Sequence, residues 1–162
     1  MALQYKNVHW LWLAALVILA DQVTKQLVIQ KITRFESIEV LPNLNFVHMH
    51  NTGAAFSMLS HLPPAAFVLL GVAVSVGILI WLRKNPSGQR IVASGLSLIL
   101  GGALGNVIDR VRLGHVTDFI DFHVGDWHFA AFNVADAAIT VGAGLLILDM
   151  LLDMRRRKAV PA

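Results

Sequence analysis

The sequence predicts an all-α polytopic membrane protein with four transmembrane helices. Of its 162 residues, 56% are hydrophobic and 14% are charged, whereas soluble domains average roughly 45–50% apolar and about 25% charged residues. The apolar residues gather in four windows, each close to the ~20 residues that cross a bilayer as a helix. These windows cover about residues 9–29, 64–82, 91–108 and 132–152. This composition excludes a disordered chain, a coiled coil and a typical soluble enzyme, and residues 1–162 are expected to form one domain.

The first window begins with residues 10–12 (WLW), an aromatic start that is typical of a membrane interface. Lys6 and the following apolar residues also resemble a cleaved signal peptide. However, residues 18–20 (ILA) are a poor small-x-small cleavage site, and apolar residues resume at Leu27. We therefore interpret this window as an uncleaved span.

The second and third windows have the features of closely packed membrane helices. The second begins near Pro64 and ends at Trp81, an aromatic residue suited to the interface. The third contains Gly101 and Gly105, a G-x-x-x-G step that lets two helix backbones approach closely. Gly102 lies beside this step, so these glycines are expected to pack helices and to support a site as well.

Lysine and arginine residues predict the orientation of the spans. They lie before the first window, between the second and third, and after the fourth: Lys6, Arg83, Lys84, Arg90 and residues 155–158. By the positive-inside rule these regions are cytoplasmic, which places both termini in the cytoplasm and residues 30–63 and 109–131 outside. The net charge of +3 is then explained by topology anchors near anionic headgroups rather than by a nucleic-acid site.

The two outer connections are expected to carry some structure. Residues 37–50 alternate partly between apolar and polar side chains, and Pro42-Asn43 is a turn signal. This pattern favours a small β-hairpin within an outer cradle over about residues 31–63. Residues 113–129 suggest an amphipathic or irregular segment, and we expect a short interfacial helix there.

Polar side chains interrupt the spans at positions where they are costly. An ionisable residue in a membrane helix costs about 2.5–3.5 kcal/mol on insertion scales, so it indicates function by default. The groups are Asp21 with Lys25, Asn106 with Asp109 and Arg110, and Asn133 with Asp136. In the predicted orientation all three groups reach the outer level of the membrane, where Asp118 can join them. The coincidence favours a buried polar site.

The residue types at this level favour carboxyl chemistry. The chain has no cysteine, and it contains neither a G-x-S-x-G nor an H-E-x-x-H motif. His48 and His50 are a weak metal-ligand pair, and no metal or other cofactor is expected. Two close carboxyls do not both ionise easily, so one can draw a proton from water while the other hydrogen-bonds the carbonyl under attack. Spacing alone leaves the members of such a pair open: Asp21, Asp109, Asp118, Asp121 and Asp136.

Two other kinds of protein also gather polar side chains in membrane helices. A small transporter or proton-coupled channel does so, but usually near the midplane and in repeated halves, and no repeat is visible here. A scaffold protein would use the same residues as helix-pairing contacts. Loss of the acidic residues would then reduce folding or association rather than turnover.

Five stretches of the chain carry a resemblance to one family. In order they are residues 21–25 (DQVTK), 51–57 (NTGAAFS), 101–110 (GGALGNVIDR), 116–122 (VTDFIDF) and 132–136 (FNVAD). They are similar to the lipoprotein signal peptidases of bacteria, also called signal peptidase II or prolipoprotein signal peptidase. The resemblance implies a multi-pass aspartic endopeptidase of the bacterial cytoplasmic (inner) membrane whose active site lies near the outer face.

The resemblance also implies a reaction and a set of site residues. The enzyme would remove the signal peptide from diacylglyceryl-modified prolipoproteins by cutting before the lipidated cysteine. Its catalytic residues would be Asp118 and Asp136. Supporting residues would be Asp21, Lys25, Asn51, Gly102, Asn106, Arg110 and Asn133. The expected partners are the lipid-modified substrate and membrane lipids, with no nucleic acid, and the protein is expected to be a monomer.

Overall fold

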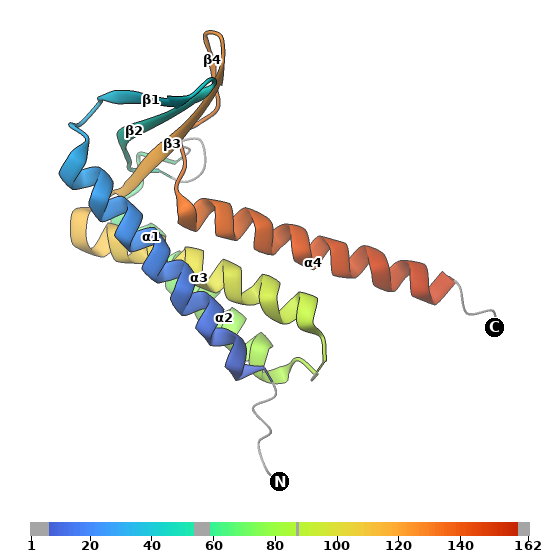
Figure 1. The fold of residues 1–162 in the computed structure, drawn as a ribbon. Coiled ribbons are helices and arrows are strands. Elements are labelled where there is room, and N and C mark those ends of the chain that lie inside the picture. The colour runs from blue at the N-terminus through green and yellow to red at the C-terminus, as the bar shows by residue number, and fades with distance from the viewer. Residues whose placement is uncertain (1–6, 54–58, 87, 159–162) are drawn as a thin grey trace.

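The computed structural model describes residues 7–53, 59–86 and 88–158. Within them, a short 3-10 turn η1 (Val8–Trp10) leads into the first of four long helices, and four strands complete the fold. The helices are α1 (Leu11–Lys31), α2 (Pro64–Lys84), α3 (Arg90–Leu113) and α4 (Val134–Lys158). The strands are β1 (Ser37–Leu41), β2 (Leu44–Asn51), β3 (Val116–Val124) and β4 (Trp127–His128). The sheet lies across one end of the helices, and the C-terminal half of α4 leaves the bundle (Figure 1).

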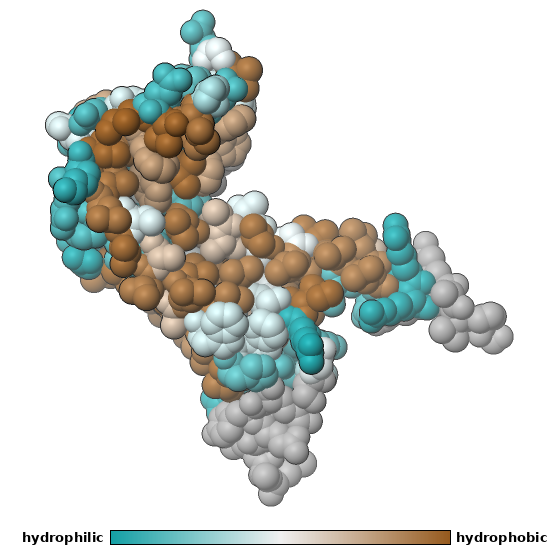
Figure 2. All heavy atoms as spheres, viewed as in Figure 1, coloured by the Kyte–Doolittle hydropathy of each residue, from teal (hydrophilic) through white to brown (hydrophobic). Residues whose placement is uncertain are grey.

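The four predicted spans are confirmed. Among the described residues, the helical segments Val8–Lys31, Pro64–Lys84, Arg90–Leu113 and Val134–Arg156 are each long and apolar enough to cross a membrane. A hydrophobic surface covers the helices, and hydrophilic residues gather toward their ends (Figure 2). The third helix runs beyond the expected end near residue 108 and stops at Gly114, whose left-handed conformation (φ +77°) caps it.

The predicted hairpin is also confirmed, and it belongs to a larger sheet. β1 and β2 pair antiparallel around a turn in which Asn43 has a φ of +69°, a conformation that asparagine tolerates better than most residues. β3 then pairs antiparallel with β2, and β4 with β3, which gives the strand order β1-β2-β3-β4. The sheet is therefore built from both of the connections that the sequence predicts to lie outside the membrane.

The expected interfacial helix over residues 113–129 is wrong. Strands β3 and β4 occupy most of this segment. The three-residue spacing of Asp118 and Asp121 imitates a helical period, but β-branched and aromatic residues dominate the segment and favour a strand. Tertiary structure decides the conformation of this segment, because β3 pairs with the edge of β2 and Met49 lies opposite Asp118.

The α3 helix is central because it packs against α1, α2 and α4. Small residues permit this close packing. A Cβ atom at Gly101 would lie 2.8 Å from the backbone oxygen of Ala14 on α1, and one at Gly102 would collide with the backbone oxygen of Ala135 on α4. The predicted packing role of these glycines is confirmed.

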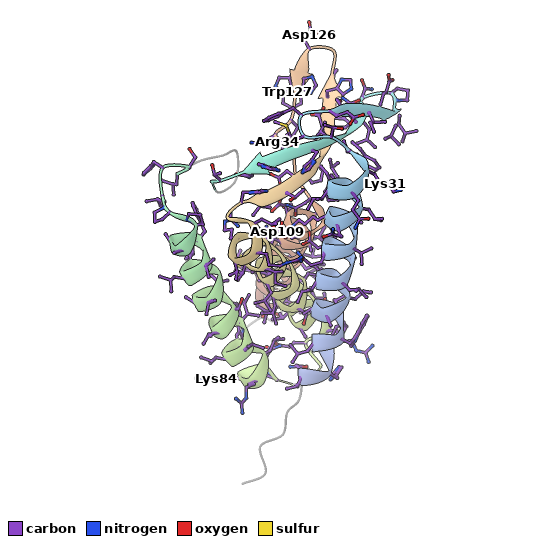
Figure 3. All side chains as sticks on the ribbon, turned by 90° about the vertical axis from the view of Figure 1, so that its left-hand side faces the viewer. Lys31, Arg34, Lys84, Asp109, Asp126 and Trp127 are labelled. Carbon is purple, nitrogen blue, oxygen red and sulfur yellow. The ribbon has the colours of Figure 1, made fainter. Side chains whose placement is uncertain are left out.

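The polar ends of the helices converge beneath the sheet. The C-terminal ends of α1 and α3 and the N-terminal end of α4 adjoin the strands (Figure 1). Figure 3 shows Lys84 at the end of the bundle opposite to Lys31 and Arg34. The predicted shared level of the polar residues is thus present in the fold, and Val28, Ile32 and Phe119 form an apolar cluster that joins α1 to β3.

Candidate active site

A buried ion cluster lies where α1 and α3 approach each other. The Nζ atom of Lys25 is 2.8 Å from Oδ2 of Asp21 and 3.0 Å from Oδ2 of Asp109. All three side chains are nearly inaccessible to solvent. Gly105 makes room for the pair, since a Cβ atom there would lie 2.7 Å from Oδ2 of Asp21. An ion cluster this deep is stable only when its remaining hydrogen-bonding capacity is also satisfied.

The two carboxylates of this cluster bind backbone amides next to Asp118 and Asp136. The N–H of Ala135 donates to Oδ1 of Asp21 over 2.9 Å. The N–H of Thr117 donates to Oδ2 of Asp109 over 3.1 Å. Because Thr117 and Ala135 directly precede Asp118 and Asp136, the cluster ties down the backbone at both aspartates.

Asn106 connects the ion cluster to Asp136. Its Oδ1 atom accepts a 3.0 Å hydrogen bond from Lys25, and its Nδ2 atom donates to Oδ1 of Asp136 over 2.8 Å. The lysine therefore fixes the orientation of the amide, since only its oxygen can accept from an ammonium group. The amide hydrogen is then directed at the carboxyl.

Asn133 holds both aspartates. Its Oδ1 atom accepts from the N–H of Asp136 over 3.0 Å, and Oδ2 of Asp136 accepts from the N–H of Asn133 over 3.3 Å. This reciprocal pair has the geometry of a capping box at the start of α4. The Nδ2 atom of Asn133 also donates to Oδ1 of Asp118 over 2.7 Å. One fully buried amide thereby couples β3 to α4.

Asn51 and Arg110 both contact the backbone of Gly53. Nδ2 of Asn51 donates to Oδ2 of Asp118 over 3.0 Å, and its Oδ1 accepts from the N–H of Gly53 over 2.9 Å. The guanidinium of Arg110 donates to the backbone oxygen of Gly53 and lies 4.8 Å from the ring centroid of Phe67. Arg110 thus bridges α3, α2 and the chain that follows β2.

The structure brings together the polar residues that the resemblance selected, but two acidic residues behave differently from each other. Asp109, one of the five candidate aspartates, is a full member of the buried ion cluster. Asp121 lies apart, where it contacts Asn45 and His128. Gly102 contributes close packing beside α4. Gln22, which was not among the predicted site residues, donates to Asp109 over 2.9 Å. Its position next to Asp21 is the feature of the sequence that could have identified it.

The carboxyl of Asp118 has unusual electrostatics. Burial, followed by the nearby charge of Asp136, raises the pKa of Asp118 to about 7. The hydrogen bonds from Asn51 and Asn133 oppose this shift, because they favour the ionised form. Asp118 consequently keeps its proton up to about pH 7.

This pKa predicts a pH-dependent difference in stability between the wild type and Asp118→Asn. Between the unfolded value of 3.8 and about 7, the folded protein holds a proton that the unfolded chain has released, so rising pH lowers the free energy of unfolding. Asparagine does not titrate, and any constant cost of its amide cancels between pH values. We expect the midpoint of thermal unfolding of the variant to rise relative to the wild type from about pH 4 to pH 8. A difference independent of pH in detergent solution would contradict the assignment.

A cavity of about 720 Å³ opens beside these residues, between α2, α3 and α4. Apolar side chains form most of its wall, and the polar side chains that line it are Asn51, Asn106, Arg110, Asp136 and Thr140. Over residues 7–53, 59–86 and 88–158, no group of three or more His, Asp or Glu side chains is arranged to hold a metal ion. The arrangement can hold an apolar ligand against the carboxyl of Asp136.

Comparison with known proteins agrees with this geometry. The model of the family Peptidase_A8, described as signal peptidase (SPase) II, matches residues 13–152. A lipoprotein signal peptidase from Coxiella burnetii (strain Dugway 5J108-111) is 50% identical over 146 residues, which cover 88% of this chain and 90% of the relative. A lipoprotein signal peptidase from Alteromonas mediterranea is 47% identical over 147 residues, covering 89% and 81% of the two chains.

A solved structure shows the same fold. It is described as "Bacterial membrane enzyme structure by the in meso method at 2.3 A resolution", with a TM-score of 0.88 and 32% identity over 100% of this chain and 99% of that chain. Together these findings decide against the transporter and scaffold alternatives. The chain belongs to the signal peptidase II family of aspartic peptidases.

Proposed function

We propose that Asp118 and Asp136 are the catalytic pair of this chain and that they cut a diacylglyceryl-modified prolipoprotein before its lipidated cysteine. As a signal peptidase II, the chain is an aspartic endopeptidase that removes signal peptides from prolipoproteins. The observation that carries the residue assignment is the pair itself. Asn133 holds both carboxyls: its side-chain amide donates to Asp118, and its backbone N–H donates to Asp136, which lines an apolar cavity between membrane helices.

The proposed roles of the two carboxyls follow from their surroundings. Asp118 is the protonated acid, because burial keeps its proton into the neutral range. Asp136 is the ionised base, and it takes a proton from water as the water oxygen attacks the scissile carbonyl carbon. Asp118 gives its proton to the carbonyl oxygen. As the C–N bond of the resulting gem-diol breaks, Asp136 gives the proton that it took from water to the leaving amine. One gem-diol hydroxyl returns its proton to Asp118, which restores both carboxyls to their starting states.

The supporting residues act on the pair in two ways. Asp21, Lys25 and Asp109 fix the backbone before each aspartate, as the hydrogen bonds from Ala135 and Thr117 indicate. Asn51 and Arg110 act on the substrate side, since both contact the chain around Gly53 beside the cavity. Positioning of this kind keeps reacting groups in the productive geometry.

We further propose that the sheet end of the molecule faces away from the cytoplasm. Arg83 and Lys84 lie at the other end of α2, and Arg155 and Arg156 lie near the C-terminal end of α4. The positive-inside rule therefore places those ends in the cytoplasm. The scissile bond then sits at the outer membrane interface, which water reaches. The cavity and the pair are complete within one chain, which supports a monomer as the active unit.

The reaction is tested with purified protein in detergent and two matched substrates. One is a prolipoprotein with a diacylglyceryl-modified cysteine, and the other is the same polypeptide with an unmodified cysteine. We expect cleavage of the first to yield a product that begins with the lipidated cysteine, little cleavage of the second, and no effect of a chelator. Equal cleavage of both substrates, or a cut elsewhere, would contradict the proposed specificity.

A further inference from the structure

A second cavity lies on the sheet side of the catalytic pair. Its volume is about 530 Å³. Met49 and His50 from β2, Asp118 from β3, and Trp127 and His128 from β4 line it. Trp127 is on the sheet, away from the membrane helices (Figure 3). The reaction described above uses Asp118 from this wall but assigns no ligand to the cavity itself.

The two cavities meet at the catalytic pair. Asp136 lines the first cavity and Asp118 lines the second, while Asn51 and residues 129–131 line both. A peptide bond held between the two carboxyls would therefore lie where the two cavities adjoin. A substrate that extends beyond that bond has room on both sides.

The walls of the two cavities differ in the same way as the two sides of the substrate. The first is built mainly from apolar residues of three spanning helices, such as Leu70, Val74 and Val141. The second is built from the sheet and carries imidazole, indole and carboxyl groups. A signal segment and a lipid chain favour the first environment, and a hydrated polypeptide that leaves the membrane favours the second.

We propose that the second cavity binds the polypeptide that follows the lipidated cysteine, as an extended segment recognised by Trp127, His50 and His128. The inference rests on the proposed function and adds a binding site for the mature side of the substrate. The indole of Trp127, 60% exposed, offers an apolar face together with an N–H donor. Such a wall suits neutral polar side chains and backbone amides.

The charge of the cavity supports this class of ligand. Loss of solvation lowers the pKa of His50 to about 4, with contributions from the nearby His115, Arg34 and His48. His50 is therefore neutral at pH 7 and offers hydrogen bonds rather than charge. The Nδ1 atom of His128 lies 2.9 Å from Oδ1 of Asp121, so that imidazole is held in place by its carboxylate partner.

The test compares two lipid-modified substrates. One ends at the lipidated cysteine as its amide, and the other continues for several residues beyond it. Trp127→Ala is expected to lower kcat/KM for the longer substrate about tenfold, chiefly through KM, and to leave that of the short substrate within about twofold. Trp12→Ala is the matched control, since Trp12 is 58% exposed on α1, remote from both cavities, and should change neither value.

A second measurement does not depend on turnover. A photoreactive amino acid placed at the second residue after the cysteine, in a substrate bound to Asp118→Asn, is expected to crosslink to Met49 or Trp127. The same probe placed before the cysteine should crosslink to α2 or α4 instead. Mass spectrometry of the digested adducts identifies the sites.

The outcomes separate this inference from the proposed function. A wild-type protein that cleaves neither substrate would overturn both. Efficient cleavage of both substrates, with Trp127→Ala lowering kcat equally for each, would identify the cavity as a route for water and overturn the inference alone. Crosslinks from the mature-side probe to the spanning helices would overturn it as well.

Discussion

Asp118→Asn and Asp136→Asn are each expected to lower kcat by about 10³-fold or more, with a smaller change in KM. Asparagine nearly matches aspartate in shape, but it can neither take a proton from water nor give one to the carbonyl oxygen. At position 118 it also places an amide NH2 beside the amides of Asn51 and Asn133, which both donate to the present carboxyl. The measurement is steady-state cleavage of the lipid-modified substrate in detergent.

Asp126→Asn provides the control for these variants. Asp126 is exposed in the turn between β3, the strand that contains Asp118, and β4 (Figure 3), and its replacement should leave kcat unchanged. The double variant Asp118→Asn with Asp136→Asn should be little slower than either single variant, because residues that act as one unit are not additive. A single variant that folds and retains more than about a tenth of wild-type kcat would remove that residue from the pair.

The spans were predictable because each depends on the composition of its own window. The identity of β3 was not, since its strand conformation depends on pairing with β2. That difference has a consequence for the site. In a helix, Asp118 and Asp121 would share a face, whereas in a strand residues three apart point to opposite faces. Asp118 accordingly meets Asn51 and Asn133, and Asp121 meets Asn45 and His128.

The ion cluster could be predicted only in part, for a related reason. The four-residue spacing of Asp21 and Lys25 indicated their pairing. The inclusion of Asp109 depends on how closely α1 and α3 approach, and that distance is set by glycines whose contacts the sequence does not specify. Likewise, spacing could not choose two of five aspartates. The choice came from the resemblance, and the shared contacts of Asn133 give it a physical basis.

Lys25→Met is expected to have the second large effect, on stability and activity together. Methionine approximates the length of the lysine stem but leaves Asp21 and Asp109 buried without their cation. Removing one partner of a buried ion pair costs about 3–5 kcal/mol, because the remaining charge is uncompensated. The change also removes the hydrogen bond that orients Asn106 toward Asp136. We expect a lower midpoint of thermal unfolding and a lower kcat in the fraction that folds.

Lys31→Met is the matched control, because Lys31 ends the same helix and is exposed; it should change neither quantity. A charge-neutral triple variant, Lys25→Met with Asp21→Asn and Asp109→Asn, separates the two effects of Lys25. Each asparagine keeps an oxygen that can accept from Ala135 or Thr117, so thermal stability should recover substantially. The kcat should recover less, because Asn106 still lacks its lysine donor. A Lys25→Met protein as stable and active as the wild type would show that the cluster does not position the pair.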